Sequence, residues 1–577
     1  MTNTRPPLLP VPRLEDSLAG LVERVRPLVG EDALARTASV AEAFSKGTGR
    51  VLQARLEGYA LSQEPHSWLT RFWEDAYLEH RGPLNGALNY LTTMPTSEVG
   101  HKSKAELCGT LVWGLTNAYL DIAKGENVQE AGRSGPLCMD QYQGLFAACR
   151  IPQAGKDAMY YGLRKGMTAD GGHIVVLYRG NIYELQVADG DGVYGIERLS
   201  EAIAAIIARS DSQPSVGILT AAPRDEAALI YERLCALGNK GNFECVHSAI
   251  FALCIDDAEG DTPNQAAFGQ LYGRGENRWF DKCVQVIVGD GPDVGFNNEH
   301  TGFDASIWVS TLIKLYEAIT ADTIPGTPGP LPELRLLEWN TDEDVLGRLR
   351  EAEEADALRG RGLVLEVLPF TDFGASAIKA AKASPDAFFH IALQLAYYRH
   401  TGGVDSTYEA VAMRQYHEGR TEAMRPSTNA ALAFVKAMGD ISISNHERAT
   451  LARIAFDKHV EMIAACQRGE APERHLFGLQ ALLGGDTLPE AEDIFSDPGY
   501  RRLCHDSISS SGLGGACMNL FCFAPVVEDG LGIGYIIGAE GIRLGFSAKG
   551  RHAAELPVFA QGLHQALRDL HDVLSSS

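Results

Sequence analysis

The stretch Gly295-Phe296-Asn297-Asn298-Glu299-His300-Thr301-Gly302-Phe303-Asp304 decides how the rest of this chain is interpreted. It follows Val284-Gln285-Val286-Ile287-Val288, which leads into a Gly-Asp-Gly-Pro turn at 289–292. This order predicts a strand, a tight turn and then a polar loop. A histidine with a carboxylate four residues later can be an oriented general base, because the carboxylate fixes the imidazole tautomer. The same spacing also occurs by chance, so the surrounding sequence must decide between a catalytic and a structural pair.

Length and charge narrow the class of protein. With 577 residues the chain exceeds what one hydrophobic core normally supports, so two or more domains are expected. A hydrophobic content of 45% and a charged content of 22% are those of an ordinary soluble protein. The net charge of −24 argues against non-specific binding to nucleic acid and against docking to anionic membranes. An anionic ligand would therefore need a local basic patch.

The cysteines and the ends of the chain indicate a cytoplasmic protein. The eleven cysteines form no C-x-x-C pair and no zinc spacing, so reduced thiols are expected. The first residues contain no apolar stretch of the kind found in secretory signals. Residues 513–527 are the longest weakly polar stretch and are too short to span a bilayer.

Periodicity predicts a mixture of helices and strands without a strict βαβ alternation, hence a mixed-sheet α/β fold. Asp16 or Ser17 is expected to cap the first helix, and a Pro- and Gly-rich break at 325–330 predicts a linker. Strands are expected at 173–178, 182–187, 216–220, 284–288, 363–368, 517–524, 532–537 and 542–547. Helices are expected at 17–28, 33–63, 67–80, 103–124, 200–209, 223–237, 341–356, 384–399, 406–419, 429–438, 446–468 and 556–575.

Several stretches, taken in order along the chain, resemble the choline/carnitine O-acyltransferases. They are Pro10–Leu18, Pro136–Tyr142, Arg150–Pro152, His173–Tyr178, Asn277–Lys282, the His300 stretch, Ser384–Phe388, Gln394–Arg399, Thr407–Glu409, Gly419–Glu422, Phe434–Asp440 and Arg474–Leu476. The resemblance implies an α/β fold of two similar mixed-sheet domains, of the chloramphenicol acetyltransferase-like, CoA-dependent type. A tunnel would run between them, with residues 1–340 carrying the histidine and residues 341–577 carrying CoA- and acceptor-binding elements.

The resemblance assigns catalytic roles to four residues. His300 would remove the acceptor's hydroxyl proton, and Asp304 would orient the imidazole. Ser509-Ser510-Ser511 matches the family's Ser-Thr-Ser, so Ser509 and Ser511 would donate hydrogen bonds to the oxyanion, worth about 3 kcal/mol per donor. The structural alternatives are a buried core histidine, a loop-capping aspartate and an ordinary polar turn.

Four further residues match the family's acceptor site. Tyr408, Thr421 and Arg474 correspond to positions that hold the carnitine carboxylate, and a guanidinium suits a carboxylate because it makes two charge-assisted hydrogen bonds. Choline acetyltransferases lack this arginine, since choline has no carboxylate. Phe546 corresponds to an aromatic beside the trimethylammonium group, where a cation–π contact is expected.

The CoA side resembles the family less closely. Lys379, Lys382, Ser384 and Asp386 match its CoA-binding positions, and the two lysines would supply the local basic patch. Solvated surface lysines are the alternative. Three positions depart from the pattern, at Ala375, Val460 and Gly512, which leaves open a weaker affinity for CoA or another thiol carrier.

The sequence therefore predicts an acyltransferase that moves an acyl group reversibly between CoA and the hydroxyl of carnitine or a similar zwitterionic hydroxy acid. The expected reaction uses acyl-CoA as co-substrate, no further cofactor, no metal and no covalent acyl-enzyme. A monomer without a membrane span is expected. One alternative is an acyltransferase for another hydroxyl or amine acceptor, or for a carrier-protein thioester. A second is a catalytically silent binding homologue, which the complete set of His300, Asp304 and Ser509–Ser511 disfavours.

Overall fold

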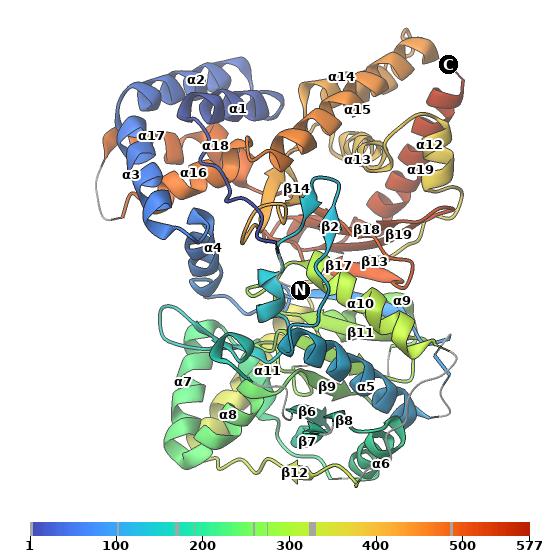
Figure 1. The fold of residues 1–577 in the computed structure, drawn as a ribbon. Helices are drawn as coiled ribbons and strands as arrows, with labels where there is room; N and C mark the ends of the chain where they lie inside the picture. The colour runs from blue at the N-terminus through green and yellow to red at the C-terminus, as the bar shows by residue number, and fades with distance from the viewer. Residues whose placement is uncertain are drawn as a thin grey trace.

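Two mixed β-sheets, one above the other in Figure 1, organise the chain in the computed structural model. The structure describes residues 4–97, 99–100, 103–167, 172–190, 192–209, 211–257, 260–273, 275–321, 330–484 and 488–576. The predicted α/β class with two mixed sheets is confirmed. The predicted linker at 325–330 lies outside the described residues, apart from Pro330.

The first sheet has nine strands in the order β12-β7-β6-β9-β10-β11-β1-β17, with β8 paired to β7. Its pairs are antiparallel except β6 with β9 and β9 with β10, which are parallel. The predicted hairpin at 173–187 is confirmed as β6 and β7. The strands are β1 Tyr90–Pro95, β6 Gly172–Tyr178, β7 Asn181–Asp189, β8 Gly192–Val193, β9 Ala252–Ile255, β10 Val284–Val288, β11 Asp293–Asn298, β12 Leu334–Leu336 and β17 Leu520–Phe523.

The chain around His300 forms a hairpin rather than a strand followed by a long loop. The predicted strand is β10, but β11 follows at once and pairs with it in the register Val286 to Phe296. Val294 and Phe296 are buried, so these residues continue the sheet instead of forming the predicted loop. The loop is thereby reduced to residues 299–304, held between a central strand and the helix that starts at Ala305.

Strand β17 joins the first sheet although it lies near the end of the chain. It pairs antiparallel with β1, Tyr90 opposite Phe523 and Thr92 opposite Phe521. Residues from beyond 500 thus complete a sheet built otherwise from residues 90–336. The exact position of the predicted domain boundary at 340 stays a prediction.

The second sheet has six strands in the order β13-β19-β18-β16-β14-β15. Its centre is parallel, β14 beside β16 and β16 beside β18. The helix predicted at 406–419 is wrong, because β14 occupies this stretch and pairs on both sides. The strands are β13 Val364–Val367, β14 Thr407–Ala412, β15 Thr421–Met424, β16 Ile508–Gly512, β18 Leu531–Ile537 and β19 Ile542–Ala548. Two short hairpins pair β2 Ala131–Gly132 with β3 Gly135–Pro136, and β4 Ala148–Ile151 with β5 Ala158–Tyr161.

Helices cover both faces of the first sheet and pack against the second. Successive side chains of β10 point to opposite faces, so Val286 enters one apolar cluster and Ile287 another. On the first sheet, one face is covered by α5 Lys104–Ala123, α6 Ile196–Ile207 and α10 Ala305–Ile319, and the other by α7 Arg224–Leu234, α8 Lys240–Ser248 and α11 Glu343–Gly360. The second sheet carries α12 Ala375–Ala380, α13 Pro385–Thr401, α14 Asn429–Gly439, α15 Asn445–Gln467 and α19 Leu556–Ser575, and α9 Pro263–Leu271 packs between the sheets.

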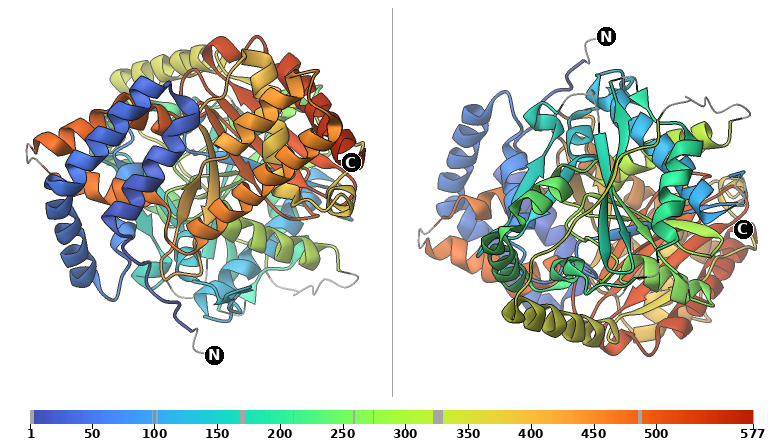
Figure 2. Two further views of the ribbon diagram at one scale, coloured as in Figure 1. Left: turned by 90° about the horizontal axis from the view of Figure 1, so that it is seen from above. Right: turned by 90° about the horizontal axis from the view of Figure 1, so that it is seen from below.

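The first four helices pack against helices from the last quarter of the chain. Figures 1 and 2 show the blue N-terminal helices beside the orange ones, and one apolar cluster contains residues of both. The elements are α1 Leu14–Val25, α2 Glu31–Lys46, α3 Thr48–Gln63, α4 Trp68–Leu78, α16 Pro472–Ala481, α17 Pro489–Ser496 and α18 Pro498–Cys504. Arg13 occupies the N-cap position of α1, so the predicted cap at Asp16 or Ser17 is wrong.

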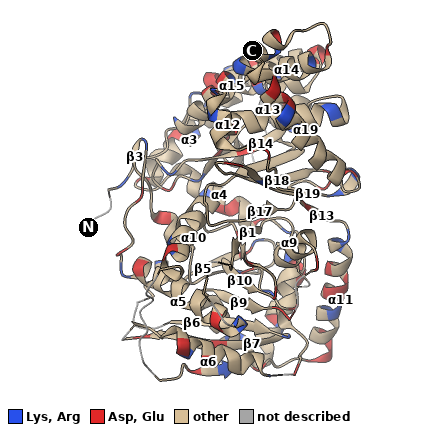
Figure 3. Cartoon of the chain, turned by 90° about the vertical axis from the view of Figure 1, so that its right-hand side faces the viewer, with Lys and Arg blue, Asp and Glu red and all other residues tan. Residues whose placement is uncertain are grey.

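Three further predictions concern single elements. The last helix is confirmed, and the acidic run after residue 341 forms α11, whose red and blue ribbon segments in Figure 3 mark its charged residues. The predicted strand at 216–220 is wrong, since Val216–Ala221 forms a buried 3-10 helix. Among the described residues, no helix combines the length and apolarity needed to cross a membrane.

Candidate active site

A cavity of about 330 Å³ contains His300 and draws its walls from both sheets and from α4. Its lining includes most of the residues that the resemblance assigned to catalysis and to the acceptor. They are His300, Tyr408, Thr421, Arg474, Ser509 and Ser511. Tyr90 and Phe521, on the paired strands β1 and β17, line the same cavity, so the strand from the end of the chain forms part of its wall.

One ring nitrogen of His300 forms a hydrogen bond with the backbone of its own loop. Its Nδ1 lies 2.9 Å from the carbonyl oxygen of Phe303. A carbonyl oxygen only accepts hydrogen bonds, so Nδ1 carries the proton and Nε2 keeps its lone pair. The rings of Tyr77 and Tyr90 pack around the imidazole, with centroids 5.7 and 5.2 Å away. A partly buried imidazole whose Nε2 has no hydrogen-bond partner among the described residues is equipped to remove a proton from a hydroxyl.

Asp304 pairs chiefly with Arg420. The Arg420 Nε lies 3.1 and 3.2 Å from the two carboxylate oxygens, whereas the nearest carboxylate oxygen is 3.8 Å from His300 Nδ1. Burial raises the pKa of the Asp304 carboxyl, but the charges of Arg420 and His300 and the hydrogen bonds from Arg420 and Gln141 together hold that pKa below its ordinary value. The hydrogen bond that orients the imidazole therefore comes from the Phe303 carbonyl, where the sequence had led us to expect Asp304.

Arg420 and Gln141 complete the support of this loop. Arg420 also donates to the carbonyl oxygens of Thr301, at 2.7 Å, and His300, at 3.0 Å. Gln141 donates to Asp304 at 3.0 Å and accepts from the Asp304 backbone N–H at 2.7 Å. Sequence reasoning assigned neither residue a role, although both lie within stretches that carried the family resemblance.

The three serines alternate along β16, as strand geometry requires. Ser510 is buried, with its hydroxyl 2.6 Å from the Tyr408 carbonyl oxygen and 2.9 Å from a Glu409 carboxylate oxygen. All three serines line the cavity, but only the hydroxyls of Ser509 and Ser511 have no hydrogen-bond partner in the described chain. Two hydroxyls on the His300 side of the strand are thus free to donate to a bound ligand.

Arg474, Thr421 and Tyr408 meet at the end of the cavity nearest α16. Arg474 donates from Nε to the Thr421 carbonyl oxygen at 2.9 Å and from its terminal nitrogen to the Tyr408 hydroxyl at 3.3 Å. Its guanidinium carbon lies 4.6 Å from the ring centroid of Trp73. No carboxylate in the described ranges forms an ion pair with it. An arginine in such a place suits an anionic ligand.

The side-chain carboxyl group of Glu422 is hydrogen-bonded to the backbone of this arginine. It accepts a bond from the Arg474 backbone N–H at 3.3 Å. Burial raises the pKa of Glu422 to about 7. The group is therefore only partly ionised at neutral pH, so it compensates the Arg474 charge only in part.

Phe546 does not reach the cavity. It is fully buried in the core of the second sheet, where its ring centroid lies 6.4 Å from that of Phe559 in an edge-to-face contact. Apart from Tyr408, the aromatic lining comes instead from residues that sequence reasoning did not select. They are Trp73, Tyr77, Tyr90, Phe477, Phe521 and Phe523. Three of them lie on α4 or β1, and only the tertiary arrangement brings them to His300.

The four predicted CoA-binding residues lie apart from this cavity, around the start of α13. Lys379 and Lys382 are exposed and have no ion pair with the described residues. Ser384 is the N-cap residue of α13, but its hydroxyl makes no capping hydrogen bond. Asp386 is already engaged, accepting from Tyr535 at 2.6 Å and lying 2.9 Å from His459 Nε2.

Known proteins resemble this chain over nearly its whole length. The sequence profile of the Choline/Carnitine O-acyltransferase family matches residues 9–565. Carnitine O-acetyltransferase of Mus musculus is 31% identical, covering 99% of this chain and 94% of its own. Mitochondrial carnitine O-palmitoyltransferase 2 of Bos taurus is 27% identical, covering 98% and 92%.

Among solved structures, a trichothecene 15-O-acetyltransferase from Fusarium sporotrichioides superimposes with a TM-score of 0.42 at 11% identity, covering 86% of this chain and 94% of its own. The family profile and the 31% identity to an acetyltransferase over the full length carry the assignment. This chain belongs to the choline/carnitine O-acyltransferase family and is an acyltransferase.

Proposed function

We propose that this enzyme transfers an acyl group reversibly between CoA and the hydroxyl of carnitine or a closely similar zwitterionic hydroxy acid. The observation that carries the proposal is the pairing, within one cavity, of His300 with Arg474. Arg474 has no carboxylate partner in the described chain, and the burial of an unpaired guanidinium is costly. A carboxylate on the acceptor supplies the missing partner, and choline has none.

The chemistry needs one base and one set of oxyanion donors. His300 Nε2 takes the proton of the acceptor hydroxyl as that oxygen attacks the thioester carbonyl. The carbonyl oxygen becomes an oxyanion, which accepts hydrogen bonds from Ser509 and Ser511. The intermediate then collapses, the carbon–sulfur bond breaks, and the imidazolium returns its proton to the CoA sulfur. The Phe303 carbonyl bond keeps the imidazole in the required tautomer throughout.

The size of the cavity favours a short acyl group. Small-molecule sites typically occupy about 300–1,000 Å³, and the cavity around His300 measures about 330 Å³. The acceptor and the acyl group both have to fit there. The names of the relatives do not decide this point, because they include an acetyltransferase and a palmitoyltransferase. The cytoplasmic location and the monomeric state stay predictions.

A thiol-release assay tests the proposal. Acyl-CoAs of increasing chain length are incubated with carnitine, with choline or without an acceptor, and the released CoA thiol is measured. Carnitine-dependent release that is largest with short acyl-CoAs is expected. Release that is independent of carnitine, or that is faster with choline, would overturn the acceptor assignment. No release from any acyl-CoA, combined with acyl transfer from an acylated carrier protein, would favour the carrier-protein alternative.

A further inference from the structure

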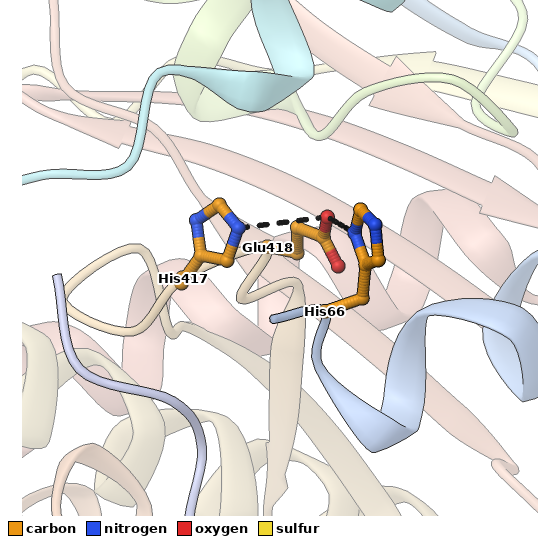
Figure 4. Close-up of side chains that lie close together, drawn as sticks. All are labelled: His66, His417 and Glu418. Carbon is orange, nitrogen blue, oxygen red and sulfur yellow. Dashed lines mark hydrogen bonds and ion pairs between the residues drawn. The ribbon is translucent and has the colours of Figure 1, made fainter. Parts of the chain in front are cut away.

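Outside the active-site cavity, two imidazoles and a carboxylate converge at His66, His417 and Glu418. Figure 4 shows the two rings on either side of the Glu418 carboxylate, turned toward it. His66 Nδ1 lies 2.6 Å and His417 Nε2 lies 3.6 Å from the same oxygen, Oε1. One ligand atom from each residue lies within 4.8 Å of the other two.

The Glu418 carboxylate is held in place by its other oxygen. Oε2 accepts from the Ser67 backbone N–H and from the Thr70 hydroxyl, both at 3.0 Å, at the first turn of α4. The side chain is nearly buried, and its backbone adopts a φ of +52°, which few residues other than glycine adopt. These contacts fix the carboxylate so that Oε1 faces the two imidazoles.

Two contacts away from Glu418 orient His417. Its backbone N–H donates to the Pro7 carbonyl oxygen at 2.7 Å. Its Nδ1 lies 3.7 Å from the Cys138 sulfur, so Nε2 is the nitrogen turned toward Glu418. Metal-binding histidines usually have their second nitrogen hydrogen-bonded to a carboxylate, a carbonyl or water, and here the Cys138 sulfur takes that place.

We propose that His66, His417 and Glu418 bind a divalent transition-metal ion of the zinc class. Two imidazoles, a carboxylate and a water molecule form a common tetrahedral ligand set for zinc. Zinc ligands at about 2.0–2.1 Å from the ion lie roughly 3.3 Å from one another in that geometry. The His66 side chain is 66% exposed, so it can adjust to this spacing and leaves a path for the ion and the water.

The site would fasten together two segments that form the walls of the active-site cavity. His66 lies two residues before α4, which contributes Trp73 and Tyr77 to the cavity. Glu418 lies two residues before Arg420, which supports the His300 loop. The ion touches no reacting atom in this arrangement, so its role is to hold the cavity walls and not to take part in acyl transfer.

Zinc binding to the purified full-length chain tests the proposal. After removal of metals with a chelator, zinc is titrated in competition with a chromogenic chelator, and the melting temperature is followed. We expect one zinc ion per chain and a raised melting temperature. Cobalt substitution is expected to give the intense visible absorption of a tetrahedral site. His66→Gln and Glu418→Gln should each weaken zinc binding at least tenfold, following the effect of losing one ligand.

His446→Gln is the matched control, because His446 is an exposed histidine on α15 outside the cluster, and it should bind zinc as the wild type does. If Glu418→Gln unfolds, His66→Gln still decides the matter, since this exposed side chain is not needed for packing. Equal zinc affinity in wild type and His66→Gln would overturn the site. So would wild-type protein that neither retains zinc nor gains thermal stability from it, which would leave only a hydrogen-bonded His-Glu-His cluster.

Discussion

The carboxylate of Asp304 forms an ion pair with the guanidinium of Arg420, and the same guanidinium donates hydrogen bonds to the backbone carbonyl oxygens of His300 and Thr301. The imidazole itself is oriented by the Phe303 carbonyl. Asp304 therefore acts on His300 through the loop, by keeping Arg420 in place. Substitutions of His300 and of Asp304 are therefore expected to have different effects.

Replacing His300 by alanine should abolish acyl transfer while the fold and the binding of both substrates persist. General-base catalysis is typically worth about 10²–10⁴-fold in rate. The measurement is kcat with acyl-CoA and carnitine, together with circular dichroism and the Kd of each substrate. A variant that keeps half of the wild-type turnover would show that His300 is not the base.

Asp304→Asn should lower stability strongly and turnover less than His300→Ala does. The change leaves the buried Arg420 without its ionic partner, and breaking a buried pair from one side typically costs about 3–5 kcal/mol. The Phe303 bond to the imidazole survives. Urea unfolding and kcat are measured on Asp304→Asn, Arg420→Met and the double variant. The two losses in unfolding free energy should be strongly non-additive, and additive losses would argue that the residues are not coupled.

Glu422→Gln should stabilise the protein at alkaline pH and have little effect in acid. Burial raises the pKa of Glu422 to about 7 from an ordinary 4.5. The folded state thus holds the proton more tightly than the unfolded chain, and the unfolding free energy falls as pH rises between these two values. The full loss is as much as about 3 kcal/mol, at 1.36 kcal/mol per pKa unit. Glutamine mimics the neutral acid and removes this dependence.

The check on Glu422 is a comparison of wild type and variant by urea unfolding near pH 5 and near pH 8. The two proteins should be similar at the lower pH and diverge at the higher one, with the variant more stable. A constant difference between them at both pH values would mean that Glu422 titrates as an ordinary glutamate.

Arg474→Asn should damage the use of carnitine far more than the use of choline. Loss of one partner of a buried charge pair costs about 3–5 kcal/mol, or roughly two to three decades in kcat/KM. The measurement is kcat/KM for both acceptors in wild type and variant. If the ratio of carnitine to choline stays unchanged, Arg474 does not bind a carboxylate, even though the protein remains an acyltransferase.

Lys379→Glu should raise the apparent KM for acyl-CoA and leave that for the acceptor nearly unchanged. The lysine is exposed in a chain with a net charge of −24 and has no ion pair in the described ranges. A cation there can compensate phosphate charge. Steady-state kinetics with CoA and with dephospho-CoA separate this role from a general surface effect. Equal use of the two thiols by the wild type would argue against a contact to the 3′-phosphate.

Local sequence patterns predicted the elements whose partners are near in the chain. The β10 strand, the β6–β7 hairpin and α19 were all foreseen from periodicity and turn residues. The stretch at 406–419 was not, because Glu, Ala, Met and Gln favour helix formation locally. Pairing with β15 and β16 overrides that preference, and no local pattern reports such a pairing.

The active site, too, contains residues that the sequence motifs identified and residues that only the tertiary structure reveals. The ordered motifs selected His300, Ser509, Ser511, Tyr408, Thr421 and Arg474, and the structure gathers these six around one cavity. Phe546 was selected by the same means and lies in the core. Arg420 was overlooked because its importance comes from three contacts to residues 300–304, which lie far from it in the chain.

The position of strand β17 also affects when the enzyme can fold during its synthesis. It fills the place next to β1, and β1 in turn lies beside β11, the strand that leads to His300. A nascent chain that has emerged only as far as residue 500 has an open sheet edge at β1 and a cavity without Phe521 and Phe523. Because domains otherwise fold as they are synthesised, this connection delays the completion of the catalytic centre until synthesis is almost finished. A truncated product therefore lacks one wall of the cavity around its histidine.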